Sequence, residues 1–102
     1  MARPVNVNAL LPIEVDFQRE RASGLRRSGD KLEDALALLA QSEKELRALS
    51  GHARVARYPA YRAAWKEAER LRWNLTVQRE ACGLRNHRDL DVIYPLPPLL
   101  KE

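Results

Sequence analysis

The chain has 102 residues, of which 45% are hydrophobic and 31% are charged, and its formal net charge is +4. This length favours a single domain, residues 1–102, and the hydrophobic fraction excludes wholesale disorder. No apolar run approaches the roughly 18 residues of a membrane span, and the first residues lack the pattern of a secretory signal. We therefore expect a cytoplasmic protein without a membrane span, and the single cysteine, Cys82, agrees with a reducing compartment.

Residues 1–11 show no hydrophobic period and contain a proline and two asparagines. We interpret them as an extended arm. The arm is too apolar for a free tail, so we expect it to lie against another surface. Its large apolar side chains are Val5, Val7, Leu10 and Leu11.

Residues 12–50 are predicted to form a long helix, because leucines recur in them every seven residues. A seven-residue spacing is two helical turns, so these leucines lie on one face. They are Leu25, Leu32, Leu39 and Leu46. The stripe passes Gly24 and Gly29 without changing phase, which favours one continuous helix with a soft point; the alternative is a break near 28–30. Gly51 stands where a left-handed glycine cap ends a helix.

The leucine stripe admits two interpretations. It can be the core face of a small helical bundle, or a zipper that pairs with a second copy. Small residues between the leucines, such as Ala35 and Ser42, allow a second helix to approach closely.

A connector is predicted from Gly51 to Pro59, because the residue before a proline disfavours helix. A second helix then covers 59–83, with Leu71 and Leu75 on its main apolar face. Trp73 and Val77 lie off that face, beside a basic row. The row is formed by Arg62, Lys66 and Arg70, at a spacing of four residues.

Residues 84–102 form a proline-rich tail, which begins with a turn or a brief helix. The segment 94–98 has polyproline II character. Its PxxP pattern is weak evidence for a docking peptide for SH3 or WW domains, and we favour the alternative, a strap across the end of the bundle.

Catalytic and metal sites are not indicated. Cys82, His87, Asp89 and Asp91 are close in sequence, but their spacing matches no strong zinc signature. Phosphate-binding loops, nucleophile elbows and HExxH motifs are absent from the sequence. We expect a protein that is not an enzyme and needs no cofactor or metal.

The predicted fold is all-α: a long antiparallel, coiled-coil-like helical hairpin with extended N- and C-terminal arms. One hairpin cannot cover all the apolar side chains, which predicts a small non-catalytic interaction or scaffold subunit that binds itself or a larger complex. The residues predicted for self-association are Leu25, Leu32, Leu39, Leu46, Leu71 and Leu75. Those predicted for an external protein partner are Trp73, Val77, Ile93, Tyr94, Leu96, Leu99 and Leu100. The alternative is a nucleic-acid-binding protein that uses Arg62, Lys66, Arg70 and Trp73.

Overall fold

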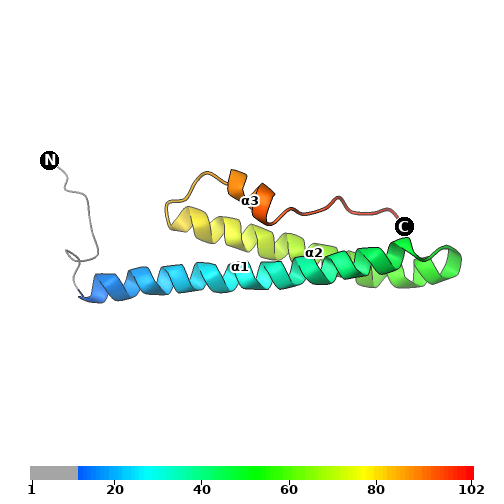
Figure 1. Cartoon of the computed structure of the whole chain (residues 1–102), viewed down its shortest axis with the longest axis horizontal. Coiled ribbons are helices and arrows are strands. Elements are labelled where there is room, and N and C mark those ends of the chain that lie inside the picture. Colours follow the sequence, from blue (N-terminus) through cyan, green and yellow to red (C-terminus); the bar gives the residue numbers. More distant parts are fainter. Residues whose placement is uncertain (1–11) are drawn as a thin grey trace.

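The computed structural model describes residues 12–102, and the side chains of residues 19–102. Two long helices, α1 (Pro12–Arg47) and α2 (Gly51–Ala81), lie antiparallel along each other, and a short helix, α3 (Arg88–Ile93), follows them (Figure 1). Residues 12–102 contain no strand. The predicted all-α hairpin is therefore confirmed, while the predicted arm at 1–11 lies outside the described residues.

Helix α1 runs without interruption through both of its glycines, so the continuous helix is confirmed and the break near 28–30 is not found. Gly29 is buried, and the reason is steric. A Cβ atom built on Gly29 would lie 2.8 Å from the hydroxyl of Tyr94. Gly29 is thus a notch that receives a side chain from the far end of the chain, rather than a soft point.

The two glycines of α1 should respond oppositely to alanine. We expect Gly24→Ala to stabilise the protein by about 1 kcal/mol, because alanine is the better helix former and the nearest atom to its Cβ would be 3.9 Å away. We expect Gly29→Ala to destabilise it by about 1 kcal/mol, because Tyr94 must move. Urea denaturation followed by circular dichroism measures both. In a Tyr94→Ala background, Gly29→Ala should become stabilising; a loss that persists there would exclude the steric explanation.

The predicted connector from Gly51 to Pro59 is wrong, because α2 already begins at Gly51 and carries Pro59 inside it. Ser50 is extended and Gly51 has a φ of 60°, a left-handed conformation that glycine adopts easily. The chain therefore reverses within residues 48–50. A proline inside a helix costs about 3 kcal/mol. Packing of Tyr58 and Tyr61, on either side of Pro59, against the core offsets that cost.

The ends of both helices also differ from the prediction. Helix α1 ends at Arg47 rather than at residue 50, and α2 ends at Ala81 rather than at residue 83. Gly51 has the predicted left-handed conformation, and Gly83, with a φ of 88°, turns the chain after α2. That turn sends the last residues back toward the hairpin.

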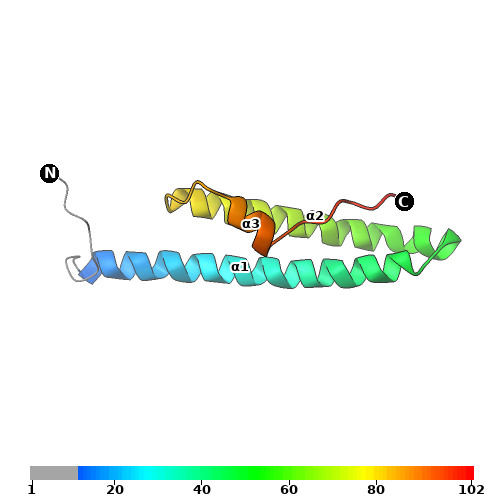
Figure 2. The ribbon, with the colours of Figure 1, turned by 45° about the horizontal axis from the view of Figure 1, so that its top comes forward.

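The core is a single layer between the helices, since the molecule measures 66 × 22 × 15 Å. One cluster of buried residues lies toward the hairpin turn, and the second lies under α3. The first comprises Ala35, Leu39, Leu46, Tyr61 and Ala68, and the second comprises Leu32, Leu75 and Leu90. Leu90 shares the second cluster with Leu32 of α1 and Leu75 of α2, and α3 lies against the hairpin beside them (Figure 2).

Residues 94–102 run back along α2 toward the hairpin turn. Leu96 and Leu100 pack against the first cluster, whose members come from both helices. The tail is therefore a strap, as one of the two interpretations held, but it lies along the hairpin rather than across its end. None of the described helices is long and apolar enough to cross a membrane.

Candidate interaction surfaces

The six leucines predicted for self-association lie in the interface between the helices of one chain. Leu32, Leu39, Leu46 and Leu75 are buried, and Leu25 and Leu71 are partly buried against the second cluster. A second copy could reach the four buried leucines only if the hairpin opened. Pairing through these leucines stays a prediction, and it now requires an exchange of helices.

The residues predicted for an external partner fall into two groups. Trp73, Val77, Ile93 and Leu99 are exposed. Tyr94, Leu96 and Leu100 are partly buried, because they pack on the core clusters of their own chain. Only the first group is available to a partner while the tail stays docked.

Trp73 is the largest exposed apolar side chain, with 66% of its surface accessible. Val77 follows it one turn later on α2, and α3 adds Ile93 and Val92, which is 82% exposed. We define these four residues as the exposed apolar set. A cavity of about 180 Å³ lies beside Trp73, and Glu69, Arg72, Thr76 and Leu96 complete its lining.

The sequence interpretation did not single out Val92. The structure reveals its position, because Leu90 is the buried residue of the six-residue helix α3. A residue two positions further along a helix is turned by about 200°, so Val92 points away from the core. Ile93, three positions after Leu90, lies nearer to the buried side, but it is the last residue of α3 and is 61% exposed.

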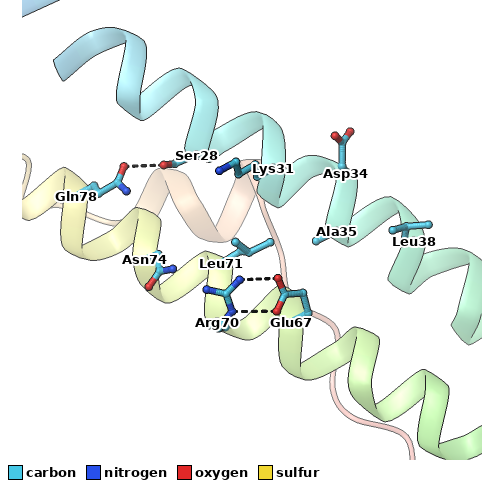
Figure 3. A pocket seen from close by; sticks show the side chains of 10 residues that line it. All are labelled: Ser28, Lys31, Asp34, Ala35, Leu38, Glu67, Arg70, Leu71, Asn74 and Gln78. Carbon is cyan, nitrogen blue, oxygen red and sulfur yellow. Dashed lines mark hydrogen bonds and ion pairs between the residues drawn. The ribbon is translucent and has the colours of Figure 1, made fainter. Parts of the chain in front are cut away.

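A second groove lies between α1 and α2, with a volume of about 450 Å³ (Figure 3). Ala35 and Leu71 form part of its lining, and Leu38, 69% exposed, lies at its edge. The Ser28 hydroxyl donates a 2.7 Å hydrogen bond to Oε1 of Gln78 across one end. The remaining lining residues are Lys31, Asp34, Glu67, Arg70 and Asn74, so charges of both signs surround the apolar floor.

The basic row predicted for nucleic acid lies on the exposed surface of α2, together with Trp73. Arg70 is held by Glu67, with Nη2 2.6 Å from Oε1 and Nε 2.9 Å from Oε2. This pair raises the pKa of Arg70 and lowers the pKa of Glu67, because each hydrogen bond favours the charged forms. Arg62 and Lys66 line a shallow cavity with Glu102. Carboxylates thus lie beside the basic row at both ends, and their negative charge weakens its attraction for the phosphates of a nucleic acid.

The tail is held by side-chain donors from one face of α2. Nε of Arg72 donates to the carbonyl of Tyr94 at 3.0 Å, and Nε1 of Trp65 donates to the carbonyl of Pro97 at 2.7 Å. The hydroxyl of Tyr58 donates to the carbonyl of Leu100 at 2.8 Å. We call Tyr58, Trp65 and Arg72 the donor ladder.

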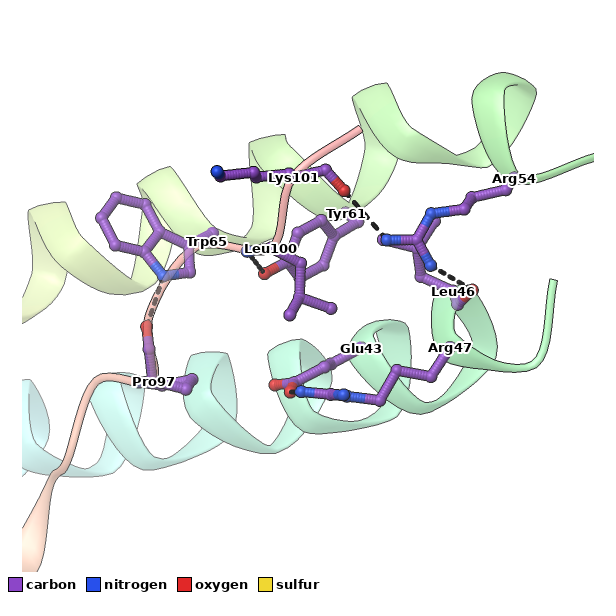
Figure 4. A network of polar contacts seen from close by, with 9 residues as sticks. All are labelled: Glu43, Leu46, Arg47, Arg54, Tyr61, Trp65, Pro97, Leu100 and Lys101. Atoms are coloured by element: carbon purple, nitrogen blue, oxygen red, sulfur yellow. Dashed lines mark hydrogen bonds and ion pairs between the residues drawn. The ribbon is translucent and has the colours of Figure 1, made fainter. Parts of the chain in front are cut away.

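Two further α2 residues extend the contact with the tail. The Leu100 amide donates to the Tyr61 hydroxyl at 2.8 Å (Figure 4). Arg54 donates to the main-chain oxygens of Lys101 and Glu102, at 2.9 and 3.2 Å. Its third contact, 3.3 Å to the carbonyl of Leu46, joins the tail to the end of α1. The main chain of the tail therefore bonds to side chains of α2, and Arg54 links it indirectly to the end of α1.

The donor ladder was missed in the sequence, although a signal was present. Arg54, Tyr61, Ala68 and Leu75 form one heptad row, which faces α1. Tyr58, Trp65 and Arg72 form a second heptad row beside it. Side chains with polar tips at regular positions within an apolar stripe indicate a polar segment packed on that stripe.

The four residues weighed as metal ligands have different partners. His87 contacts Glu80 at 3.0 Å, and Asp91 forms an ion pair with Arg72. Cys82 is partly buried and Asp89 is exposed. Within residues described by the structure, no group of three or more His, Cys, Asp or Glu side chains is arranged to hold a metal ion.

Comparisons with protein-family models, with curated proteins and with solved structures find no significant match. The function proposed for the chain therefore rests on its own surfaces.

Proposed function

We propose that the protein is a small non-catalytic interaction or scaffold subunit that docks on a protein partner through the exposed apolar set. The observation that carries this proposal is the exposure of Trp73. Its indole remains largely open to solvent after α3 and the tail have folded back onto the hairpin. Single exposed apolar residues are ordinary, but tryptophan is among the residues that most often dominate binding at protein interfaces.

The shape of the chain supports the same function. Its radius of gyration is 18.9 Å, whereas a compact chain of this length has about 13 Å. A rod with a single-layer core exposes much surface for its mass. Such a surface suits a subunit that contacts other proteins along its length.

We expect Trp73→Gln to reduce binding of the protein partner at least tenfold, because an interface anchor is lost. Stability should change by less than about 0.5 kcal/mol, because the side chain is exposed and glutamine favours helix. Affinity capture with quantitative mass spectrometry measures the loss of binding to a foreign partner. The molar mass in solution measures the loss of binding to a second copy.

Val55→Gln is the matched control, since Val55 is an exposed apolar residue near the other end of α2. It should leave binding unchanged. A wild-type protein that stays monomeric and retains no partner would contradict the proposal, as would a partner retained equally by Trp73→Gln.

Nucleic-acid binding is the second candidate, because Arg62, Lys66, Arg70 and Trp73 are all exposed on α2. The ion pair of Arg70 with Glu67 disfavours it. Gel shifts at two salt concentrations separate the candidates. A complex that weakens steeply with salt and disappears in Arg62→Glu/Arg70→Glu would favour nucleic acid over a protein partner.

A further inference from the structure

The surface under the tail is formed by the donor ladder together with Tyr61, Ala64 and Ala68, and it is distinct from the groove at Ala35 and Leu71. We propose that this surface, called the groove below, is a binding site for extended proline-rich peptides, and that residues 94–102 occupy it as a resident ligand. This site shares no residue with the exposed apolar set, although Arg72 and Leu96 also line the cavity beside Trp73, and it goes beyond the function proposed above. The sequence of the resident ligand is YPLPPLLKE.

The first argument is a match between two periods. The residues of the donor ladder are seven apart on α2, and the carbonyls that they bind, those of Tyr94, Pro97 and Leu100, are three apart. Seven helical residues advance about 10.5 Å. Three residues of polyproline II make one turn and advance about 9.3 Å, so equivalent carbonyls return to one side at nearly the same interval. Long donor side chains can absorb the difference of about 1 Å per repeat.

The second argument is the chemistry of an extended segment that pairs with no neighbouring main chain. Such a segment leaves its main-chain donors and acceptors without partners, and burying them without hydrogen bonds costs free energy. Pro95, Pro97 and Pro98 carry no N–H, so the tail presents mainly acceptors. The groove supplies donors to those acceptors. A proline-rich segment is therefore the kind of peptide that satisfies this groove best.

The third argument is the shape of the groove. Ala68 is fully buried and Ala64 is partly buried, so the floor is low. Aromatic side chains stand around it, and the rings of Tyr58 and Tyr61 are tilted at 55° with centroids 5.8 Å apart. Aromatic-lined grooves are the usual receptors for polyproline II segments. Leu96 and Leu100 are the apolar anchors of the resident peptide.

The tail can leave without disrupting the helices. Each hydrogen bond that joins it to α2 runs between a side chain and the main chain of the tail. Release therefore breaks no main-chain hydrogen bond within α1 or α2. A tethered ligand has a high effective concentration, so a free peptide competes poorly with the tail in the wild-type protein.

The experiment uses the full chain with a weakened tail, Leu96→Ser/Leu100→Ser, and a fluorescein-labelled peptide of sequence YPLPPLLKE. Fluorescence anisotropy should show saturable binding to this variant, at least tenfold tighter than to the wild-type protein. Adding Trp65→Phe should weaken binding about fivefold, which corresponds to one hydrogen bond. A control peptide with serine at the positions of Leu96 and Leu100 should not bind.

The proposal is overturned if the folded variant does not bind the peptide, or if the wild-type protein binds it equally well. Should the variant fail to fold, amide hydrogen exchange of the wild-type protein decides. We expect the Leu100 amide to exchange at least tenfold faster than that of Leu39, because the tail opens alone. Equal rates would mean that the tail leaves only when the whole protein unfolds, and the groove would then be no separate site.

Discussion

Replacing Leu39 by alanine is expected to lower the free energy of unfolding by about 2 to 5 kcal/mol. Leu39 has no exposed surface, and it packs in the first cluster together with Tyr61 and Ala68. The substitution removes buried apolar atoms and leaves a cavity. The surrounding side chains relax only in part, so the cavity adds to the cost of the lost burial. Urea denaturation followed by circular dichroism measures the loss.

The neighbouring substitution Leu38→Ala is the matched control. It deletes the same atoms one position earlier on α1, where the side chain is 69% exposed. We expect the free energy of unfolding to change by no more than about 0.5 kcal/mol, because the deleted atoms are mostly exposed already and alanine favours helix. Equal losses for the two variants would mean that the leucine stripe does not mark the buried face.

The hairpin and its core face were predictable because their signal is local and repeated. Leu32, Leu39 and Leu46 recur in phase, and each recurrence supports the same helix and the same buried face. The long helix through Gly24 and Gly29 follows from that constant phase. Neither glycine changes the period, and the structure keeps one helix through both.

The notch at Gly29 could not be predicted, because its cause lies at Tyr94, far away in the sequence. The position of Pro59 inside α2 was missed for a related reason. A proline marks a helix boundary only when nothing compensates for its lost hydrogen bond, and here the compensation comes from the packing of Tyr58 and Tyr61. Contacts between distant segments decide both cases.

The candidate surfaces were predictable in part. The exposure of Trp73 and Val77 followed from their place off the main apolar face of α2. Leu96 and Leu100 were predicted to bind an external partner as well, because the sequence of the tail has no period that shows which surface it packs against. The evidence that the tail packs on its own chain lay in α2, in the polar tips of the donor ladder.

Replacing Tyr61 by alanine is expected to cost about 3 to 5 kcal/mol, as other deletions of buried aromatic rings do. Tyr61 is fully buried, and it is the largest of the fully buried side chains among the described residues. Its ring packs in the first cluster, and its hydroxyl accepts the hydrogen bond of the Leu100 amide. The substitution therefore weakens the helix interface and the attachment of the tail together. Urea denaturation gives the loss of stability, and amide exchange reports on the tail.

Tyr61→Phe separates these two contributions, because it keeps the ring and removes only the hydroxyl. We expect it to cost about 1 kcal/mol, the net contribution of one hydrogen bond. Exchange of the Leu100 amide should become faster, whereas exchange of the Leu39 amide should change only by as much as the global stability changes. Since Tyr61→Ala also removes the ring from the first cluster, its loss should exceed the loss in Tyr61→Phe by about 2 kcal/mol or more. If both variants lost the same amount, the ring would contribute nothing to the core, and the first cluster would not hold the helices together.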